Sequence, residues 1–318
     1  MSAPRSGEFD LIARFFAPLA GPGALGLKDD AALVKPSPGC ELVLTADTVI
    51  AGVHFREGDP ADLIARKALR VNLSDLAAKG ARPIGFLHAL TLNPGIDDTW
   101  LELYARGLGQ DAHAYGMPLL GGDTTMSHGP LTITITALGE VPAGEALLRS
   151  GARAGDVVYV TGTIGDSALG LACLKGDLLL PREDRAALVE RYHLPRPRVD
   201  AALRGIANAA LDVSDGLVAD LGHMAAASQV AIVLDRDAVP LSQAARKAVT
   251  KDPRLWERVL AGGDDYEIAF AAPESAAARI VSGVPPITAI GRVGAGSGVT
   301  VTVNGTPLAL SSTGYRHR

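Results

Sequence analysis

The sequence has little cysteine, and its two cysteines are not arranged as a metal or redox site. Cys40 and Cys173 lie far apart in a chain of 318 residues, and neither belongs to a CxxC pair or a Cys/His cluster. Disulfide frameworks have more cysteines than this, and structural zinc sites need cysteine or histidine ligands at close spacings. We therefore expect a reduced protein without a zinc site, of the kind found in the cytoplasm.

Aromatic residues and positive charge are scarce as well. Phe, Trp and Tyr make up 4% of the chain, and the formal net charge is -5. Single-stranded nucleic acids are bound by stacking on aromatic side chains, and DNA and RNA in general by basic surfaces. The composition therefore argues against nucleic acid as a partner, although an acidic protein can bind phosphate anions through metal ions.

Long apolar runs and the common ATP-binding loop are missing too. Charged residues interrupt every apolar stretch, so we expect neither a signal peptide nor a membrane-spanning helix. No GxxxxGK[ST] motif occurs, which excludes a P-loop enzyme. Residues 161–166 (TGTIGD) lack the third glycine of a dinucleotide-binding loop, which favours a structural turn at this point.

Length and hydrophobic patterning predict two α/β domains. With 318 residues and a hydrophobic fraction of 47%, the chain has material for two cores. Residues 142–155 have no periodicity, so we place the boundary there, with domains at 1–145 and 146–318. Strand and helix patterns mix without a regular βαβ repeat, which predicts mixed sheets rather than a barrel or a doubly wound fold. The predicted helices are 8–19, 60–78, 97–115, 167–173, 199–207 and 217–224, and the predicted strands are 41–45, 84–92, 131–141, 156–161, 230–234, 266–271, 287–293 and 299–303.

What the sequence does contain is a set of six aspartate-bearing clusters among small or apolar residues. Single carboxylates in such surroundings are costly to bury, so they usually share a cation. An all-oxygen ligand set suits Mg²⁺, which in turn binds phosphate. The pattern therefore predicts a phosphate site with several magnesium ions, assembled from distant parts of the chain. The clusters are residues 28–30 (KDD), 45–47 (TAD), 72–75 (NLSD), 121–123 (GGD), 212–216 (DVSDG) and 262–265 (GGDD).

Taken singly, some clusters have a simpler structural interpretation. Asp29 and Asp30 suit a turn or a helix N-cap. Asp47, by contrast, comes just past an apolar strand, where ligand sites commonly form. Asp75 lies on a mostly apolar helix, with Asn72 three residues before it on the same face. An unpaired carboxylate would be costly at that position, which favours a shared site.

The remaining candidates are also open to two interpretations. The glycine pair before Asp123 lets the backbone approach a ligand closely. Ser214 or Asp215 could cap the helix that follows, or the same helix N-terminus could face phosphate; the local pattern leaves both open. His54 lies between apolar residues and Arg149 lies in the linker, where a packed histidine and a solvated charge are the simpler interpretations.

In their order along the chain, these motifs resemble those of the thiamine-monophosphate kinases, a family within the superfamily of aminoimidazole ribonucleotide synthetase. The resemblance covers nearly the whole chain. Residues 45–47, residues 52–55 (GVHF) and the Gly-Tyr-x-His tail at 314–317 are particular to the kinases. The motifs shared more loosely across the superfamily are SDLAAKGARP at 74–83, GGDTT at 121–125, VTGTIGDSALGL at 160–171, DVSDGL at 212–217 and GGDDYE at 262–267.

The resemblance implies a fold, a reaction and a set of site residues. The implied fold has an N-terminal α/β domain that pairs its sheet across a homodimer, and a C-terminal α/β domain that closes over the site. The implied reaction transfers the γ-phosphoryl group of ATP to thiamine monophosphate with Mg²⁺ as cofactor. The metal positions fall on Asp30, Thr45, Ala46, Asp47, Asp75, Asp123, Asp212 and Asp215. The ATP positions fall on Tyr104, Gly122, Asp123, Arg149 and Ser214, and the substrate positions on His54, Asp264 and Tyr315.

Four positions depart from the family pattern. Lys28 stands where glycine is usual, and Arg318 stands where an aromatic residue is common. Ala46 replaces a threonine that helps to hold magnesium, so only its backbone carbonyl could serve. Asp264 has a shorter side chain than the usual glutamate. None of these departures removes a carboxylate from the clusters.

The implied reaction needs no acid, base or nucleophile from the protein, because the acceptor is already a phosphate anion. Its obstacle is repulsion: two unit charges about 4 Å apart cost roughly 4 kcal/mol at an effective dielectric constant of about 20. Several divalent ions offset that repulsion and align the oxygens for in-line transfer. The alternatives are another ATP-dependent enzyme of the superfamily, of the purine-pathway cyclo-ligase or selenophosphate synthetase type, and a non-catalytic protein that binds Mg²⁺ or nucleotide.

Overall fold

The computed structural model describes residues 7–280 and 286–315 of the chain. The chain divides into two compact units, the first made of Met1–Leu76 and Ala81–Gly144, and the second of Ala77–Gly80 and Glu145–Arg318. Among the helices that are described, none is both long and apolar enough to cross a membrane.

The first unit is built on a four-stranded mixed sheet with the strand order β1-β4-β2-β3. Strands β1 (Cys40–Ile50) and β2 (Arg82–Leu92) both pair antiparallel with β4 (Thr132–Pro142). Strand β3 (Leu119–Met126) pairs parallel with β2. The predicted mixed sheet is thus confirmed for this unit.

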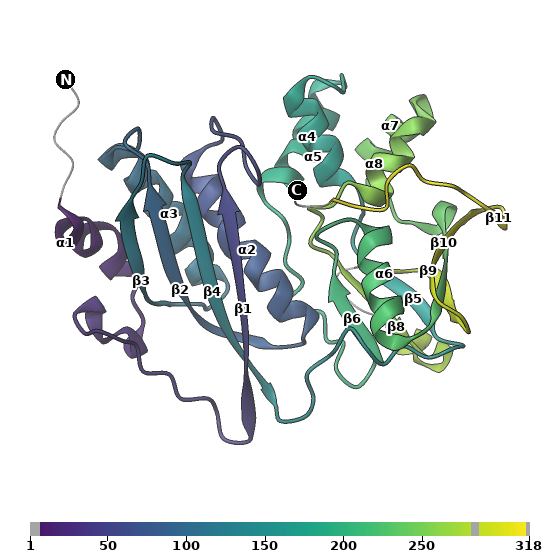
Figure 1. Cartoon of the computed structure of the whole chain (residues 1–318), viewed down its shortest axis with the longest axis horizontal. Helices are drawn as coiled ribbons and strands as arrows, with labels where there is room; N and C mark the ends of the chain where they lie inside the picture. Colours follow the sequence, from purple (N-terminus) through teal and green to yellow (C-terminus); the bar gives the residue numbers. More distant parts are fainter. Residues whose placement is uncertain (1–6, 281–285, 316–318) are drawn as a thin grey trace. The chain divides into compact units, whose positions relative to one another are not determined.

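Two helices cover one face of this sheet (Figure 1). They are α2 (Ala61–Ala78) and α3 (Asp98–Ala114), and the Asp97 side chain caps α3 by accepting a hydrogen bond from the Trp100 N–H. Alternate residues of the strands, such as Ile133 and Ile135 of β4, are fully buried. Their neighbours of opposite phase point to the other face, where Leu44 of β1 is 62% exposed and Leu87 of β2 is 39% exposed.

The segment before β1 forms short irregular turns instead of the single helix predicted at 8–19. An α-helical turn, α1 (Glu8–Leu11), passes into a π turn (Ile12–Phe16) and then a 3₁₀ turn (Ala17–Leu19). Pro18 lies in that last turn, and a proline has no N–H with which to continue an α-helix. The apolar spacing still holds, since Phe15 and Phe16 are buried.

The second unit contains a seven-stranded mixed sheet with the order β11-β10-β7-β9-β5-β8-β6. Only β7 and β10 pair in parallel; the other neighbouring strands within the described residues pair antiparallel. The strands are β5 (Val157–Thr161), β6 (Ala209–Asp212), β7 (Ala231–Asp235), β8 (Ile268–Ala272), β9 (Ile287–Gly294), β10 (Gly298–Val303) and β11 (Thr306–Pro307).

Both faces of this sheet carry apolar cores, because the side chains of each central strand alternate between two buried clusters. Val158 and Val160 of β5 belong to one cluster, and Val157 and Tyr159 to the other. The first cluster includes residues of α4, α6 and α7, and Tyr159 stacks on Phe270 in the second. The helices of this unit are α4 (Asp166–Lys175), α5 (Arg182–His193), α6 (Leu217–Ser228), α7 (Gln243–Lys251), α8 (Trp256–Ala261) and α9 (Ala277–Ile280).

The structure differs from the sequence prediction at several elements. Strand β1 continues to Ile50, so Asp47 lies within the strand and not just past it. Residues 119–126, which include the GGD cluster, form a strand that was not predicted. The predicted helix at 199–207 is wrong: successive turns occur there, and Gly205 has a φ of +68° that an α-helix cannot accommodate.

Candidate functional site

In the first unit, strand β1 and helix α2 bring two of the aspartate clusters together. Thr45 Oγ1 donates a hydrogen bond to Asp75 Oδ2 at 2.5 Å. The Asp47 N–H donates to Asn72 Oδ1 at 3.1 Å. Thr45 and Asp47 share the face of β1 that meets the helix, because side chains two residues apart point the same way. Ala46 lies between them and is exposed on the other face, so its methyl group is directed away from these carboxylates.

The electrostatics of this group favour a cation. Burial, together with a smaller contribution from the negative charge of Asp75, raises the pKa of Asp47 to about 6. Two carboxylates, a hydroxyl and an amide oxygen form an all-oxygen donor set of the kind that Mg²⁺ prefers. A bound divalent cation would relieve both the desolvation and the repulsion, so the residues present fit a magnesium ion.

A pocket of about 750 Å³ in the same unit is lined by two further clusters. Asp29 and Asp30 are exposed at its wall, where Asp29 Oδ1 accepts a hydrogen bond from the Asp30 N–H at 2.8 Å. Gly122 and Asp123 of β3 line another wall. Other lining residues come from the turns before β1 and from the open face of the sheet: Phe16, Ala31, Leu87, Ala89, Thr134 and Thr136.

A buried polar pair lies at this pocket. His88 lines it, and His88 Nε2 lies 2.8 Å from the hydroxyl of Tyr104 on α3. Burial lowers the pKa of His88 to about 4, so its ring is neutral at pH 7. Tyr104, which the resemblance placed at an ATP position, is fully buried and reaches the pocket region through His88.

His54 lies in a tight turn after β1. Its Nδ1 accepts a hydrogen bond from the Ile50 N–H at 3.0 Å, and its backbone carbonyl accepts one from Lys67 Nζ at 3.1 Å. The Gly52 N–H closes the turn on the Phe55 carbonyl at 2.8 Å. His54 is therefore held by its own turn and by α2, and is not a loosely packed surface residue.

In the second unit, three sequence motifs meet around the loop before α6. The Asp264 N–H donates to the Ser214 carbonyl at 2.7 Å, and the Tyr315 N–H donates to the Asp215 carbonyl at 2.8 Å. Gly263 has no room for a Cβ, which would lie 2.4 Å from the Ser214 carbonyl oxygen. Asp212 is the last residue of β6 and leads directly into this loop. The structure thus gathers Asp212, Ser214, Asp215, Asp264 and Tyr315 in one region of the unit.

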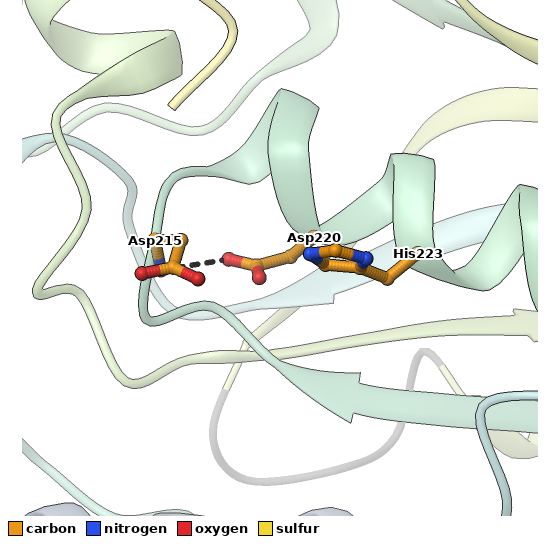
Figure 2. Close-up of side chains that lie close together, drawn as sticks. All are labelled: Asp215, Asp220 and His223. Atoms are coloured by element: carbon orange, nitrogen blue, oxygen red, sulfur yellow. Dashed lines mark hydrogen bonds between the residues drawn. The ribbon is translucent and has the colours of Figure 1, made fainter. Parts of the chain in front are cut away.

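Two residues of this region were missed by the sequence analysis. Asp220 Oδ2 accepts hydrogen bonds from three consecutive backbone N–H groups, at residues 214, 215 and 216, at 3.0, 3.0 and 3.1 Å. Burial and the charge of Asp215 raise the pKa of Asp220 to about 7, although the hydrogen bonds from the three N–H groups oppose the rise. Ligand atoms of Asp215, Asp220 and His223 lie within 4.8 Å of one another (Figure 2). The i, i+3 spacing of Asp220 and His223 on a helix was the available signal.

Among the residues that it describes, the structure does not show the remaining predicted positions in contact with these groups of residues. Arg149 is exposed in the segment between β4 and β5, and its backbone carbonyl accepts a hydrogen bond from Ser228 Oγ at 3.3 Å. Lys28 is exposed. Arg316 and His317 of the tail motif, and Arg318, lie outside the described residues.

Comparison with known families accounts for most of the chain. Residues 28–141 match the family described as AIR synthase related protein, N-terminal domain. Residues 153–304 match AIR synthase related protein, C-terminal domain. The hydrogenase maturation protein HypE of Escherichia coli, at 22% identity and a TM-score of 0.75, shows the same fold.

Closer relatives are thiamine-monophosphate kinases. The chain is 42% identical to that of Caulobacter vibrioides (98% of this chain, 90% of the relative) and 44% identical to that of Escherichia coli K12 (98% of both). The crystal structure of thiamine-monophosphate kinase from Stenotrophomonas maltophilia has a TM-score of 0.83 at 42% identity, over 95% of this chain and 98% of that one. The structure of AaThiL complexed with AMPPCP and TMP has a TM-score of 0.79 at 32% identity, over 99% of both chains. The chain therefore belongs to the AIR synthase related family and, within it, to the thiamine-monophosphate kinases.

Proposed function

We propose that this protein transfers the γ-phosphoryl group of ATP to thiamine monophosphate, giving thiamine diphosphate and ADP. The observation that carries the proposal is the carboxylate group of Asp47 and Asp75, with Thr45 and Asn72, held between a strand and a helix of a chain that belongs to this kinase family. A relative of the same fold is described with AMPPCP and TMP bound, which supports a nucleotide and a thiamine phosphate as the two ligands.

The chemistry explains why the site has carboxylates and no assigned acid, base or nucleophile. The attacking group is a phosphate oxygen that is already ionised, so no proton has to be removed from it. Magnesium ions, when bound, would neutralise the charge of the two polyanions that must approach each other. Asp47, Asp75 and the Thr45 hydroxyl would hold such ions, and the hydrogen bonds of Thr45 and Asn72 keep the carboxylates and the strand in register. We infer a direct in-line transfer without a covalent enzyme intermediate.

The other residues take the roles that the resemblance assigned to them. In the first unit, Asp30, Asp123 and the Ala46 carbonyl are proposed as further magnesium ligands, and Tyr104 and Gly122 as part of the ATP site. In the second unit, Asp212 and Asp215 are proposed as magnesium ligands. The proposed contacts to ATP in this unit are Arg149 and Ser214, and the proposed contacts to thiamine monophosphate are Asp264 and Tyr315. In the first unit, His54 is proposed as a contact to thiamine monophosphate.

The direct test incubates the protein with ATP, Mg²⁺ and thiamine monophosphate and measures thiamine diphosphate by chromatography. Turnover with this acceptor supports the proposal. Lack of product, together with ATP-dependent turnover of a formyl-amidine or selenide substrate, would move the protein to another branch of the superfamily. Tight nucleotide and Mg²⁺ binding without any ATP-dependent product would instead indicate a binding protein.

A substitution at Asp75 tests the proposed metal role in the same assay. Asp75→Asn keeps an oxygen that can accept the Thr45 hydrogen bond but removes the negative charge. We expect kcat/KM to fall at least about 100-fold, in the range seen when a preorganised electrostatic group is removed. Asp62→Asn, in the first turn of the same helix, is the matched control and should stay within about threefold of the unsubstituted protein. Equal activity of the two variants would refute the metal role of Asp75.

We also propose that the protein is a homodimer in which the open face of the first unit's sheet meets a second copy. That face carries exposed Leu42, Leu44 and Leu87, at 37%, 62% and 39%. Apolar groups gathered on one sheet face usually mark an interface, and symmetric dimers are the commonest assemblies. The resemblance to a family that pairs this sheet across a homodimer favours a second copy over another partner.

A further inference from the structure

Lys67 is a buried cation in the middle of helix α2, and the proposed mechanism does not use it. The residue is 3% exposed. Lysines are almost never buried to this extent without a partner that compensates the charge. One partner is the backbone carbonyl of His54, to which Lys67 Nζ donates a hydrogen bond at 3.1 Å. The helix therefore reaches the turn that presents a proposed substrate-binding residue.

The turn around His54 is ordered by hydrogen bonds that fix the imidazole ring. The Ile50 N–H donates to His54 Nδ1 at 3.0 Å, and the His54 N–H donates to the Ile50 carbonyl at 2.9 Å. Gly52 turns the chain with a φ of +81°, a conformation that favours glycine. Because Nδ1 accepts a hydrogen bond, the proton of the neutral ring resides on Nε2. His54 therefore offers an N–H donor in one fixed orientation.

Lys67 is placed to secure that orientation from outside the turn. The bonds to Ile50 tie the histidine to the end of β1, and all of them are local. The Lys67 bond joins the turn to α2, the same helix that presents Asp75 to Thr45. Helix α2 thus contacts both the proposed metal-binding residues and the turn of His54, the proposed substrate-binding residue of this unit. The Lys67 hydrogen bond is suited to hold the turn, because a charged donor forms a stronger hydrogen bond than a neutral one.

We propose that Lys67 is a positioning residue for the thiamine monophosphate site, acting through His54. This inference rests on the proposed function, because it takes His54 to contact the substrate. The ammonium group holds the His54 carbonyl, the turn then holds the ring, and the ring donates from Nε2 to an acceptor oxygen of the substrate. A purely structural role would stabilise the fold without affecting one substrate more than the other.

Steady-state kinetics of Lys67→Met distinguish these roles. The methionine side chain is similar to the aliphatic part of lysine in length and apolar character, but it cannot donate a hydrogen bond to the His54 carbonyl. We expect the KM for thiamine monophosphate to rise about tenfold, the KM for ATP to change less than about twofold, and Lys67→Arg to recover most of the loss. Arg66→Gln is the matched control, since Arg66 is the neighbouring cation of α2 and pairs with Asp111 instead of the His54 turn. Equal increases in both KM values would overturn the proposal.

A double-mutant cycle tests whether Lys67 acts through the histidine. If it does, Lys67→Met should have little further effect on the KM for thiamine monophosphate in a His54→Ala background. Independent effects that multiply would show that Lys67 acts elsewhere, and would overturn the inference.

A readout that needs no activity separates this inference from the proposed function. Nitrogen NMR of the His54 ring distinguishes an accepting Nδ1 from a protonated one. Lys67→Met should shift these signals and speed hydrogen exchange at the Ile50 amide, whereas Arg66→Gln should leave both unchanged. If the unsubstituted protein does not phosphorylate thiamine monophosphate, the proposed function is refuted, but the ring signals still test whether Lys67 positions His54. Unchanged His54 signals in Lys67→Met would refute this positioning role.

Discussion

At the scale of single residues, Asp47 is costly to the fold and useful to the proposed site. Its pKa is raised to about 6 from 3.8, so folding favours the protonated form. The folded state therefore binds more protons between these values, and the ionised carboxylate reduces stability as the pH rises through that window. At pH 7.5 the carboxylate is ionised, and the free energy of unfolding is lower by up to about 3 kcal/mol than it would be without the pKa shift. A bound cation would remove this loss of stability.

We therefore expect Asp47→Asn to be more stable than the unsubstituted protein at pH 7.5 without Mg²⁺. Its free energy of unfolding should be larger by roughly 1–3 kcal/mol, so its urea midpoint should be higher. Adding Mg²⁺ should stabilise the unsubstituted protein more than the variant, because the variant lacks the charged ligand. Urea unfolding with and without Mg²⁺ measures both effects. Asp200→Asn, at an exposed position in a turn, is the control and should change neither. A variant less stable than the parent without metal would contradict this account.

His88 makes the opposite contribution to pH dependence. Burial lowers its pKa to about 4 from 6.5, so the folded state requires the neutral ring. The unfolded chain binds a proton that the folded one does not, and the stability due to this residue is complete above pH 6.5 and lost as the pH falls toward 4. The loss should reach about 2–3 kcal/mol at pH 4.

The variant His88→Gln isolates this effect, since glutamine cannot titrate and still offers a hydrogen-bonding group to the Tyr104 hydroxyl. Urea unfolding at several pH values from 7 to 4 should show a steeper decline for the unsubstituted protein than for the variant. Parallel declines would mean that His88 is not the group responsible.

At the scale of elements, patterns that repeat over many residues were predictable. The apolar stripes gave helices close to α2 and α3, and the alternation at 131–141 gave a strand close to β4. Strand β3 was missed because its glycines and polar residues hide the alternation; its pairing with β2 defines it. Helices α5, α7 and α8 were not predicted, for different reasons. Helix α5 is rich in charged residues and has no clear apolar stripe, the buried face of α7 is mostly alanine, and α8 has only six residues.

Strand β3 depends on Gly122 for its pairing with β2. A Cβ at this position would lie 1.8 Å from the carbonyl oxygen of His88, its neighbour in the parallel pair. We expect Gly122→Ala to lose at least about 2 kcal/mol of unfolding free energy and to weaken nucleotide binding, because backbone cannot move aside cheaply. Gly121→Ala is the matched control, since its Cβ would meet only Leu87 Cδ2 at 3.4 Å. Urea unfolding and nucleotide titration compare the stability and the nucleotide affinity of the two variants. Equal stability of Gly122→Ala and Gly121→Ala would contradict this role of Gly122.

At the scale of the whole molecule, the sequence could predict which residues belong to the candidate site better than how they are held. Each aspartate cluster was recognisable because its carboxylates lie among apolar residues. Asp220 and Lys67 were not, because their roles come from contacts with backbone groups elsewhere in the fold: three N–H groups of the loop before α6 and the carbonyl of His54. The spacing of Asp220 and His223 could point to a shared helix face, but a single sequence does not show which backbone carbonyl or N–H a side chain contacts, since nearly every residue supplies both.

The exposed face of the first unit's sheet leads to a prediction about the oligomeric state of the protein. A stable interface needs an apolar centre, and Leu44, at 62% exposure, is the most exposed of the three leucines on that face. Sedimentation should show a dimer for the unsubstituted protein and a monomer for Leu44→Glu, because an interface that places glutamate at its apolar centre leaves a desolvated charge on each copy. Leu179→Glu is the control: Leu179 is 82% exposed in the second unit, and its substitution should leave the dimer intact. A monomeric parent protein, or dissociation of both variants alike, would exclude this face as the dimer interface.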